Sequence, residues 1–155
     1  MLLSKTCVYG IRATLYLASV KGENYVSIKS ISSKLDISFH FLTKILQMLT
    51  SAEIMESFRG PRGGVRLLGD PNQVTLMDIV AAIDGKDLFI ECALGLPGCG
   101  IAQPCPLHDK WARTRDRIRF LLESTSLIEL SKLAVEKNLR LSHEVGINQI
   151  LGLTD

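Results

Sequence analysis

The amino-acid sequence predicts a mainly α-helical chain with one small β-hairpin. Apolar residues recur at helical spacing through most of the 155 residues. Residues 54–68 differ, because two short strand-like runs there flank a turn of Gly and Pro. With 46% hydrophobic and 22% charged residues, the composition fits one globular domain with an appended element. No apolar run could span a membrane and no signal-peptide pattern is present, so we expect a cytoplasmic protein.

Three helices are expected before the hairpin. The first spans residues 5–20, with Ser4 as a possible cap. The second opens at Ser27 and ends before Asp36. The third is capped by Ser38, and its buried face carries Leu42, Ile45, Leu46 and Leu49. Two helices joined by a tight turn form a helix-turn-helix pattern.

The opposite face of the third helix is polar. Its exposed positions are Ser38, His40, Thr43, Lys44 and Gln47. Such side chains are able to reach base edges or phosphates in a DNA groove. An ordinary solvated face remains the alternative explanation for this helix taken alone.

The hairpin carries two arginines at its tip. Arg59 and Arg62 lie among glycines and a proline, and Gly63 and Gly64 allow a close approach of the backbone to another surface. A wing of this kind is able to insert arginine into the narrow minor groove. A phosphate-cradling loop is the alternative, but the glycine spacing matches neither common nucleotide-binding pattern.

The charge distribution agrees with an anionic partner for the first half of the chain. Residues 1–68 contain nine Lys and Arg against four Asp and Glu, whereas residues 69–155 contain nine against twelve. The net charge of +2 hides this difference. The basic half is therefore the candidate for contact with an anionic partner.

A cysteine-rich segment follows the basic half of the chain. It reads Cys92-x6-Cys99-x5-Cys105-x2-His108, with glycines and prolines between the potential ligands. Three thiolates and an imidazole so close in sequence are able to converge on one metal centre. Pro106 is expected at the first position of a helix, which would place the Cys105 thiol at a helix N-terminus.

Other uses of these cysteines remain open. Cysteine is often a small buried residue, so the three thiols could simply fill a core. Tight zinc sites usually contain ligand pairs two to four residues apart, whereas the wider gaps here suit a larger cluster. Disulfides are disfavoured in a reducing compartment.

Three further helices are predicted. Thr75 and Asp78 form a capping box at the start of one helix, and another covers residues 126–137. Between them lies a long helix with an apolar stripe suited to a partner helix: Leu107, Trp111, Ile118, Leu121 and Leu122. The stripe could instead pack on its own domain. Residues 138–155 lack a dense apolar pattern and are expected to be a tail of uncertain order.

Residues 37–46, residues 57–67 and the cysteine segment together resemble the Rrf-two family of winged helix-turn-helix regulators. The resemblance extends to about Lys137. It implies a winged helix-turn-helix DNA-binding domain at 1–84, a cluster-binding loop at 85–106 and dimerisation helices at 107–137. It also implies a cytoplasmic bacterial homodimer that binds palindromic double-stranded operator DNA. Neither a membrane nor a small-molecule substrate is expected, and because no nucleophile has a plausible base partner, the chain is not expected to be an enzyme.

The resemblance also implies the cluster ligands. They fall on Cys92, Cys99 and Cys105, and His108 matches the fourth ligand of the cluster-assembly regulators, although their first gap is x5 rather than x6. In the nitric-oxide-sensing subgroup a helix-one carboxylate completes the site, and the matching residue here is Val8. Its neighbour Cys7 is either an alternative ligand from the other subunit or an ordinary buried cysteine.

The function expected from these features is a repressor whose operator binding is tuned by an iron-sulfur cluster. A 2Fe-2S centre is favoured and a 4Fe-4S centre is possible. The alternative is the same DNA-binding fold with zinc or free thiols in the loop, as a structural site or a thiol redox switch. Some family members lack a cluster and respond through a partner protein, so the sensed signal stays open among iron, oxygen, nitric oxide and thiol redox state.

Overall fold

The computed structural model describes residues 2–20, 22, 24–100, 102–143 and 145–153. It confirms a mainly helical chain with a two-stranded antiparallel hairpin in this part of the sequence. In chain order the elements are α1 (Lys5–Ser19), α2 (Ile28–Leu35), α3 (Phe39–Ser51), β1 (Met55–Phe58), β2 (Gly64–Leu67), α4 (Leu76–Ile83), the short 3-10 helix η1 (Asp87–Phe89), α5 (His108–Ser124), α6 (Leu127–Glu136) and α7 (Ile147–Leu151).

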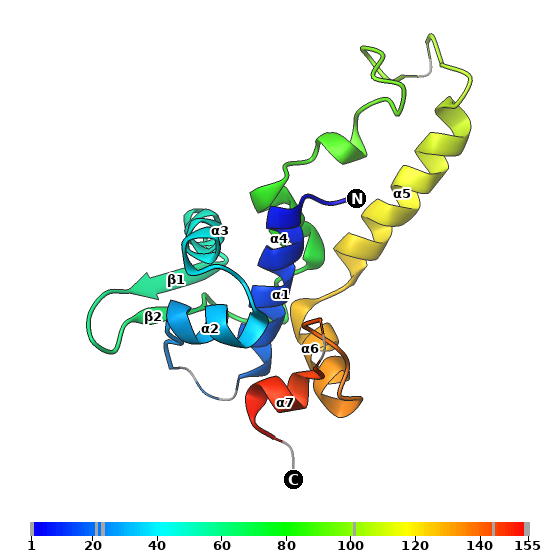
Figure 1. The fold of residues 1–155 in the computed structure, drawn as a ribbon. Helices are drawn as coiled ribbons and strands as arrows, with labels where there is room; N and C mark the ends of the chain where they lie inside the picture. Colours follow the sequence, from blue (N-terminus) through cyan, green and yellow to red (C-terminus); the bar gives the residue numbers. More distant parts are fainter. Residues whose placement is uncertain (1, 21, 23, 101, 144, 154–155) are drawn as a thin grey trace.

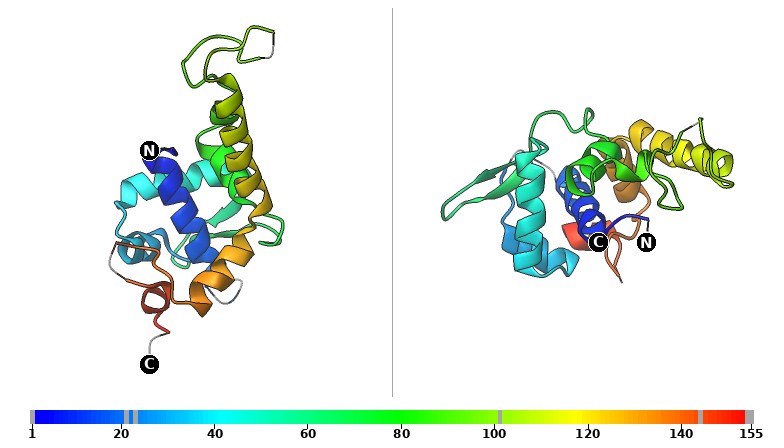
Figure 2. Two further views of the ribbon diagram at one scale, coloured as in Figure 1. Left: turned by 90° about the vertical axis from the view of Figure 1, so that its right-hand side faces the viewer. Right: turned by 90° about the horizontal axis from the view of Figure 1, so that it is seen from above.

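Helix α1 lies at the centre of the molecule (Figure 1). Helices α2 and α3 and the hairpin lie on one side of it, and α4, α5 and α6 lie on the other. Helix α5 extends away from this body as an arm. The cysteine segment lies at the far end of this arm in Figure 1 and in both views of Figure 2. The hairpin and the cysteine segment therefore lie at opposite ends of the molecule.

Side-chain caps define where several helices begin. The Ser4 hydroxyl accepts a hydrogen bond from the Cys7 amide at 3.0 Å. Thr75 and Asp78 form the predicted reciprocal capping box. Caps of this kind satisfy amides that the helix itself leaves unpaired, and each typically stabilises the fold by about 1 kcal/mol. Ser38 occupies the cap position of α3, but its side chain makes no capping hydrogen bond.

The core forms where α1 meets the helix-turn-helix. The four apolar residues predicted for the buried face of α3 are all inaccessible to solvent, and they pack with Ala13, Tyr16 and Leu17 of α1. Helix α1 also approaches α4 closely at Gly10, where an added Cβ would overlap the side chain of Ile83. These contacts fix the orientation of α3 relative to the rest of the chain.

Two sequence expectations are corrected by the structure. Pro106 does not open α5, because the helix begins at His108 and Pro106 lies in a preceding turn closed by the His108 amide and the Cys105 carbonyl at 2.9 Å. Residues 138–155 are more than a tail, since α7 lies within them and buries Ile147 and Ile150 in the core. Glu144 and residues 154–155 lie outside the described residues.

Among the described helices, none has the length and apolar character that crossing a membrane would require.

Candidate DNA-binding face and cysteine loop

The turn between α2 and α3 is held by its backbone conformation and by Arg12. Asp36 adopts a left-handed conformation with φ of 52° and ends α2. The Arg12 guanidinium donates to the carbonyl oxygens of Leu35 and Leu141, each at 2.7 Å. Arg12 therefore ties the turn to the C-terminal segment, and the polar face of α3 remains free of the body.

The residues predicted to contact DNA from α3 lie on this outer face. Ser38, His40 and Lys44 are exposed, as is Gln47. Thr43 is half-buried, and its hydroxyl donates to the Phe39 carbonyl at 2.8 Å. The exposed side chains are thus positioned on one helix face whose buried side is fixed by the core.

The three arginines of the hairpin differ in their surroundings. Arg59 and Arg62 are exposed near the tip. Arg66 instead pairs with Glu56 across the two strands, and its guanidinium lies 4.9 Å from the centre of the Tyr25 ring. Arg66 therefore stabilises the base of the wing, whereas the two tip arginines are available to a partner.

A third strand-like segment anchors the wing. Val26 and Val65 exchange two backbone hydrogen bonds, both of 2.9 Å. A Cβ on Gly64 would overlap the Val26 backbone, and one on Gly63 would overlap the Phe58 carbonyl. Both glycines are thus required by packing within the chain, whatever the wing contacts.

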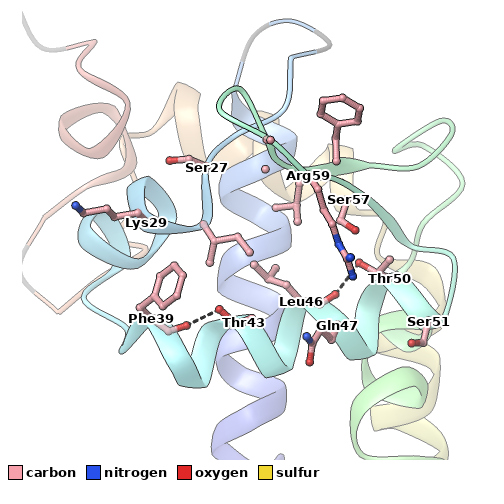
Figure 3. A pocket seen from close by; sticks show the side chains of 16 residues that line it. Ser27, Lys29, Phe39, Thr43, Leu46, Gln47, Thr50, Ser51, Ser57 and Arg59 are labelled. Atoms are coloured by element: carbon pink, nitrogen blue, oxygen red, sulfur yellow. Dashed lines mark hydrogen bonds between the residues drawn. The ribbon is translucent and has the colours of Figure 1, made fainter.

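A groove of about 520 Å³ separates α3 from the wing. Figure 3 shows Arg59 extending from the wing across this groove toward Thr50 of α3. Phe39 and Phe58 also line the groove and are 45% and 57% exposed. Sequence reasoning missed these two aromatic residues and Lys29. Phe39 could have been predicted from the sequence, because it is an apolar residue directly after the helix cap Ser38 on an otherwise polar face.

The cysteine segment brings its potential ligands together as two pairs. The Cys92 and Cys105 sulfurs lie 3.8 Å apart. The Cys99 sulfur lies 3.6 Å from the Nδ1 atom of His108. Among the described residues, no group of three or more His, Cys, Asp or Glu side chains surrounds a single point closely enough to hold one metal ion.

The spacing within each pair fits two ligands of one tetrahedral metal. Bonds of about 2.3 Å to sulfur and about 2.0 Å to nitrogen place two thiolates about 3.8 Å apart, and a thiolate and an imidazole about 3.6 Å apart. Both values agree with the observed distances. The two pairs are thus compatible with the ligation of two metal atoms, one by each pair.

The loop thiols and Cys7 differ in their electrostatic surroundings. Amide hydrogen bonds from Leu94 and then Leu96 lower the pKa of the Cys92 thiol, and contacts with Cys105 and Cys99 act in the same direction. Burial raises the pKa of Cys7 to about 12, with a further contribution from Asp84. Ionisation to the thiolate that binds metals is thus easier for Cys92 than for Cys7.

The position of Cys7 supports a packing role. Its side chain is fully buried with Met77, Val80, Phe89 and Leu122. A ligand to the partner subunit's cluster would have to be accessible at the surface. Cys7 is therefore an ordinary core cysteine in this structure.

The apolar stripe of α5 divides between two sides of the helix. Ile118 and Leu122 pack against the chain's own domain. The other side exposes Phe120 and Leu121, which are 70% and 59% accessible, and Leu107 is 37% accessible. Phe120 was absent from the predicted stripe. The exposed side is the one available to a second copy of the chain.

Comparison with known protein families supports the same interpretation of the fold. The model of the Rrf2 family, described as an iron-dependent transcriptional regulator, matches residues 3–133. The chain belongs to the Rrf2 family. Members of this family are transcriptional regulators rather than enzymes, and the winged helix-turn-helix described above is the DNA-binding part of such a regulator.

Several relatives carry the name of a helix-turn-helix regulator. BadM of Rhodopseudomonas palustris is 41% identical over 91 residues, which are 59% of this Rrf2 chain and 58% of BadM. IscR of Vibrio campbellii is 31% identical over 124 residues, or 80% of this chain and 73% of IscR. CymR of Bacillus subtilis is 30% identical over 123 residues, or 79% and 84% of the two chains.

Solved structures give the same two names. The structure of CymR, called the global cysteine regulator of B. subtilis, superposes with a TM-score of 0.72 and 29% identity over 84% of this chain and 96% of CymR. IscR of T. potens superposes with a TM-score of 0.70 and 26% identity over 89% and 91% of the two chains. This Rrf2 chain is therefore similar to regulators of both kinds.

Proposed function

We propose that this Rrf2 regulator is a homodimeric repressor whose binding to palindromic operator DNA is tuned by a 2Fe-2S cluster. The observation that carries the proposal is the pairing of Cys92 with Cys105 and of Cys99 with His108 at the spacing of metal ligands. A 2Fe-2S centre needs two such pairs, one for each iron. The similarity to IscR supports the same assignment.

The loop residues hold the centre and set its chemistry. When bound, an iron-sulfur cluster supplies a one-electron couple that also reacts with oxygen and nitric oxide. Cys92 would lose its proton to the metal more readily because two backbone amides stabilise the charge of its thiolate and lower its pKa. His108 would be the one nitrogen ligand of the centre, beside three sulfur ligands.

The DNA-binding residues act at the other end of the molecule. Lys44 and Gln47 on α3 face outward, where a recognition helix meets the major groove. Arg59 and Arg62 would contact phosphates and the minor groove from the wing. Arg59 also lines the groove between the wing and α3, so it lies beside the outer face of the recognition helix.

Helix α5 connects the two ends. Its first residue is the proposed ligand His108, and after Thr125 the chain enters α6, which packs on α1. The start of α6 also joins the start of α4, because Leu76 and Leu127 donate to the carbonyls of Thr125 and Val74. If the exposed side of α5 pairs with a second chain, a change at the loop would alter the spacing of the two winged domains. That spacing decides operator fit.

A thiol switch is the second candidate function. Cys92 has a lowered thiol pKa, and its sulfur lies 3.8 Å from that of Cys105, so a small movement would allow a disulfide to form. The similarity to CymR favours this alternative. Zinc in the loop is a third arrangement, and the pairing of the donors favours it less.

A selection from random duplexes tests the proposed function. Protein purified without oxygen from iron-replete cells is used in its cluster-loaded form and again after the cluster has been removed. We expect the selection to enrich a two-fold symmetric sequence, and the affinity for that duplex to differ at least tenfold between the two forms. Equal affinity of the two forms would contradict cluster control, and the absence of any enriched sequence would contradict operator recognition.

A further inference from the structure

Arg115 stands out among the basic residues of α5, because it contacts the cysteine loop. It lies seven residues after His108, two helical turns along the same face. One terminal nitrogen is 3.9 Å from the Cys99 sulfur and 3.3 Å from the carbonyl oxygen of Glu91. The side chain therefore reaches both a proposed ligand and the residue that precedes Cys92.

Trp111 reinforces the same attachment. Its indole N–H donates to the Glu91 carbonyl at 3.0 Å, so Arg115 and Trp111 share one acceptor. Both side chains lie on α5, one turn apart. Together they fasten the beginning of the loop to the helix that begins at His108.

One N–H donor of the Arg115 guanidinium makes no hydrogen bond within the described part of the chain. This donor is the Nε atom, which is shielded from solvent. A buried donor of this kind is destabilising unless an acceptor is present. A negatively charged group held by the loop would supply that acceptor, and ionised sulfur is a stronger acceptor than a neutral thiol.

We propose that Arg115 is a positioning residue of the cysteine loop that fastens it to α5 and raises the reduction potential of the bound cluster. Reduction adds negative charge to the centre, and a fixed cation beside Cys99 stabilises that charge. Hydrogen bonds to the sulfurs and the net charge nearby are recognised determinants of cluster potential. This inference rests on the proposed function, because it assumes that the loop holds a cluster.

Three variants separate the contributions of charge and geometry. Arg115→Met removes the charge and the donors but keeps an unbranched apolar stem, which is two atoms shorter than the arginine side chain. Arg115→Lys keeps the charge and loses the planar fork. Arg117→Met is the matched control, since Arg117 is an exposed arginine on the same helix.

The midpoint potential of the loaded proteins is the first readout. For Arg115→Met we expect the ratio of reduced to oxidised cluster, measured at the wild-type midpoint, to fall about tenfold, which is about 59 mV for one electron. Arg115→Lys should recover most of this loss, and Arg117→Met should match the wild type. A wild-type potential in Arg115→Met would overturn the electrostatic role.

Fluorescence of the cluster-free proteins is the second readout. Trp111 is the chain's single tryptophan, so its emission reports the attachment of the loop without interference. We expect a red shift in Arg115→Met and none in Arg117→Met. Unchanged emission in Arg115→Met would overturn the fastening role.

The two readouts also separate this inference from the proposed function. Wild-type protein without iron and sulfide would refute cluster sensing, and with it the effect of Arg115 on potential, while the emission of Trp111 would still decide the fastening role. Wild-type protein with a cluster but no change in either readout for Arg115→Met would refute the inference alone.

Discussion

The surroundings of Cys92 in the loop differ from those of Cys7 in helix α1. Cys92 lies near two amides and two other thiols, whereas Cys7 lies among apolar side chains and near Asp84. The sequence alone identified the loop cysteines as candidate ligands. It could not pair Cys92 with Cys105, because that pairing depends on how a loop rich in glycine and proline folds back.

Replacement of His108 by Ala should leave a labile cluster. The imidazole is the one proposed ligand that is not a thiolate, and its loss would open a coordination position to water. We expect the variant to lose its iron faster than the wild type on exposure to a chelator, as followed by visible absorption. Retention of iron at the wild-type rate would remove His108 from the set of ligands.

Cys7 should make stability depend on pH in the alkaline range. Its folded-state pKa of about 12 lies above the value of about 8.5 for an unfolded cysteine. The folded state therefore holds this proton more tightly, so the stabilising contribution is complete below about pH 8.5 and declines as the pH rises toward 12.

The variant Cys7→Ala isolates this effect, because all other titrating groups are shared with the wild type. At pH 7 we expect the variant to be less stable by about 1 kcal/mol, since a buried sulfur is lost. As the pH rises from 7 the difference should shrink, vanish at about pH 9 and reverse in sign by about pH 11 in urea unfolding experiments, because only the wild type loses this contribution. A difference that stays constant over this range would contradict the raised pKa.

At the scale of elements, helix boundaries were the most predictable feature. Ser4, Ser27 and Thr75 each cap a helix, as their position before an apolar pattern predicted. The Val26 bridge that anchors the wing was not predictable, because two residues carry no periodic signal and the pairing joins distant parts of the chain. The start of α5 was placed too early because Pro106 is equally compatible with a turn.

The wing arginines should contribute salt-dependent affinity. For Arg59→Ala or Arg62→Ala we expect weaker binding to the selected duplex. The slope of log affinity against log salt should become shallower by about one unit for each DNA phosphate that the variant no longer neutralises. Fluorescence anisotropy across a salt series measures both quantities.

Arg66→Ala is the informative comparison for these variants. Since Arg66 pairs with Glu56 at the base of the wing, its removal should lower the thermal stability as well as the affinity. An affinity and a salt slope that are unchanged in Arg59→Ala and Arg62→Ala would exclude binding of the wing to DNA.

At the scale of the whole molecule, the sequence predicted the long helix α5, but it did not predict which of its side chains face the chain's own domain. The apolar stripe indicated a packing helix, but the structure turns Ile118 and Leu122 toward the chain's own domain and leaves Phe120 and Leu121 outward. Helix α7 was missed because Ile147 and Ile150 form only one turn of apolar pattern. Their burial depends on packing against residues far away in the sequence.

A charge on the outward side of α5 should prevent dimerisation. The double variant Phe120→Glu, Leu121→Glu would place two carboxylates in the proposed interface, and we expect it to sediment as a monomer at concentrations where the wild type is a dimer. Leu68→Glu is the control, because Leu68 is also exposed but lies beyond the wing. A monomeric wild type, or a double variant that remains dimeric, would contradict this interface.

The central claim is that the paired ligands of the loop hold a 2Fe-2S cluster. Measurement of iron, acid-labile sulfide and zinc on protein purified without oxygen from iron-replete cells tests this claim most directly. The account predicts about two iron and about two sulfide per chain, together with visible absorption. About one zinc per chain with no sulfide would contradict it, and the loop would then be a structural site or a thiol switch.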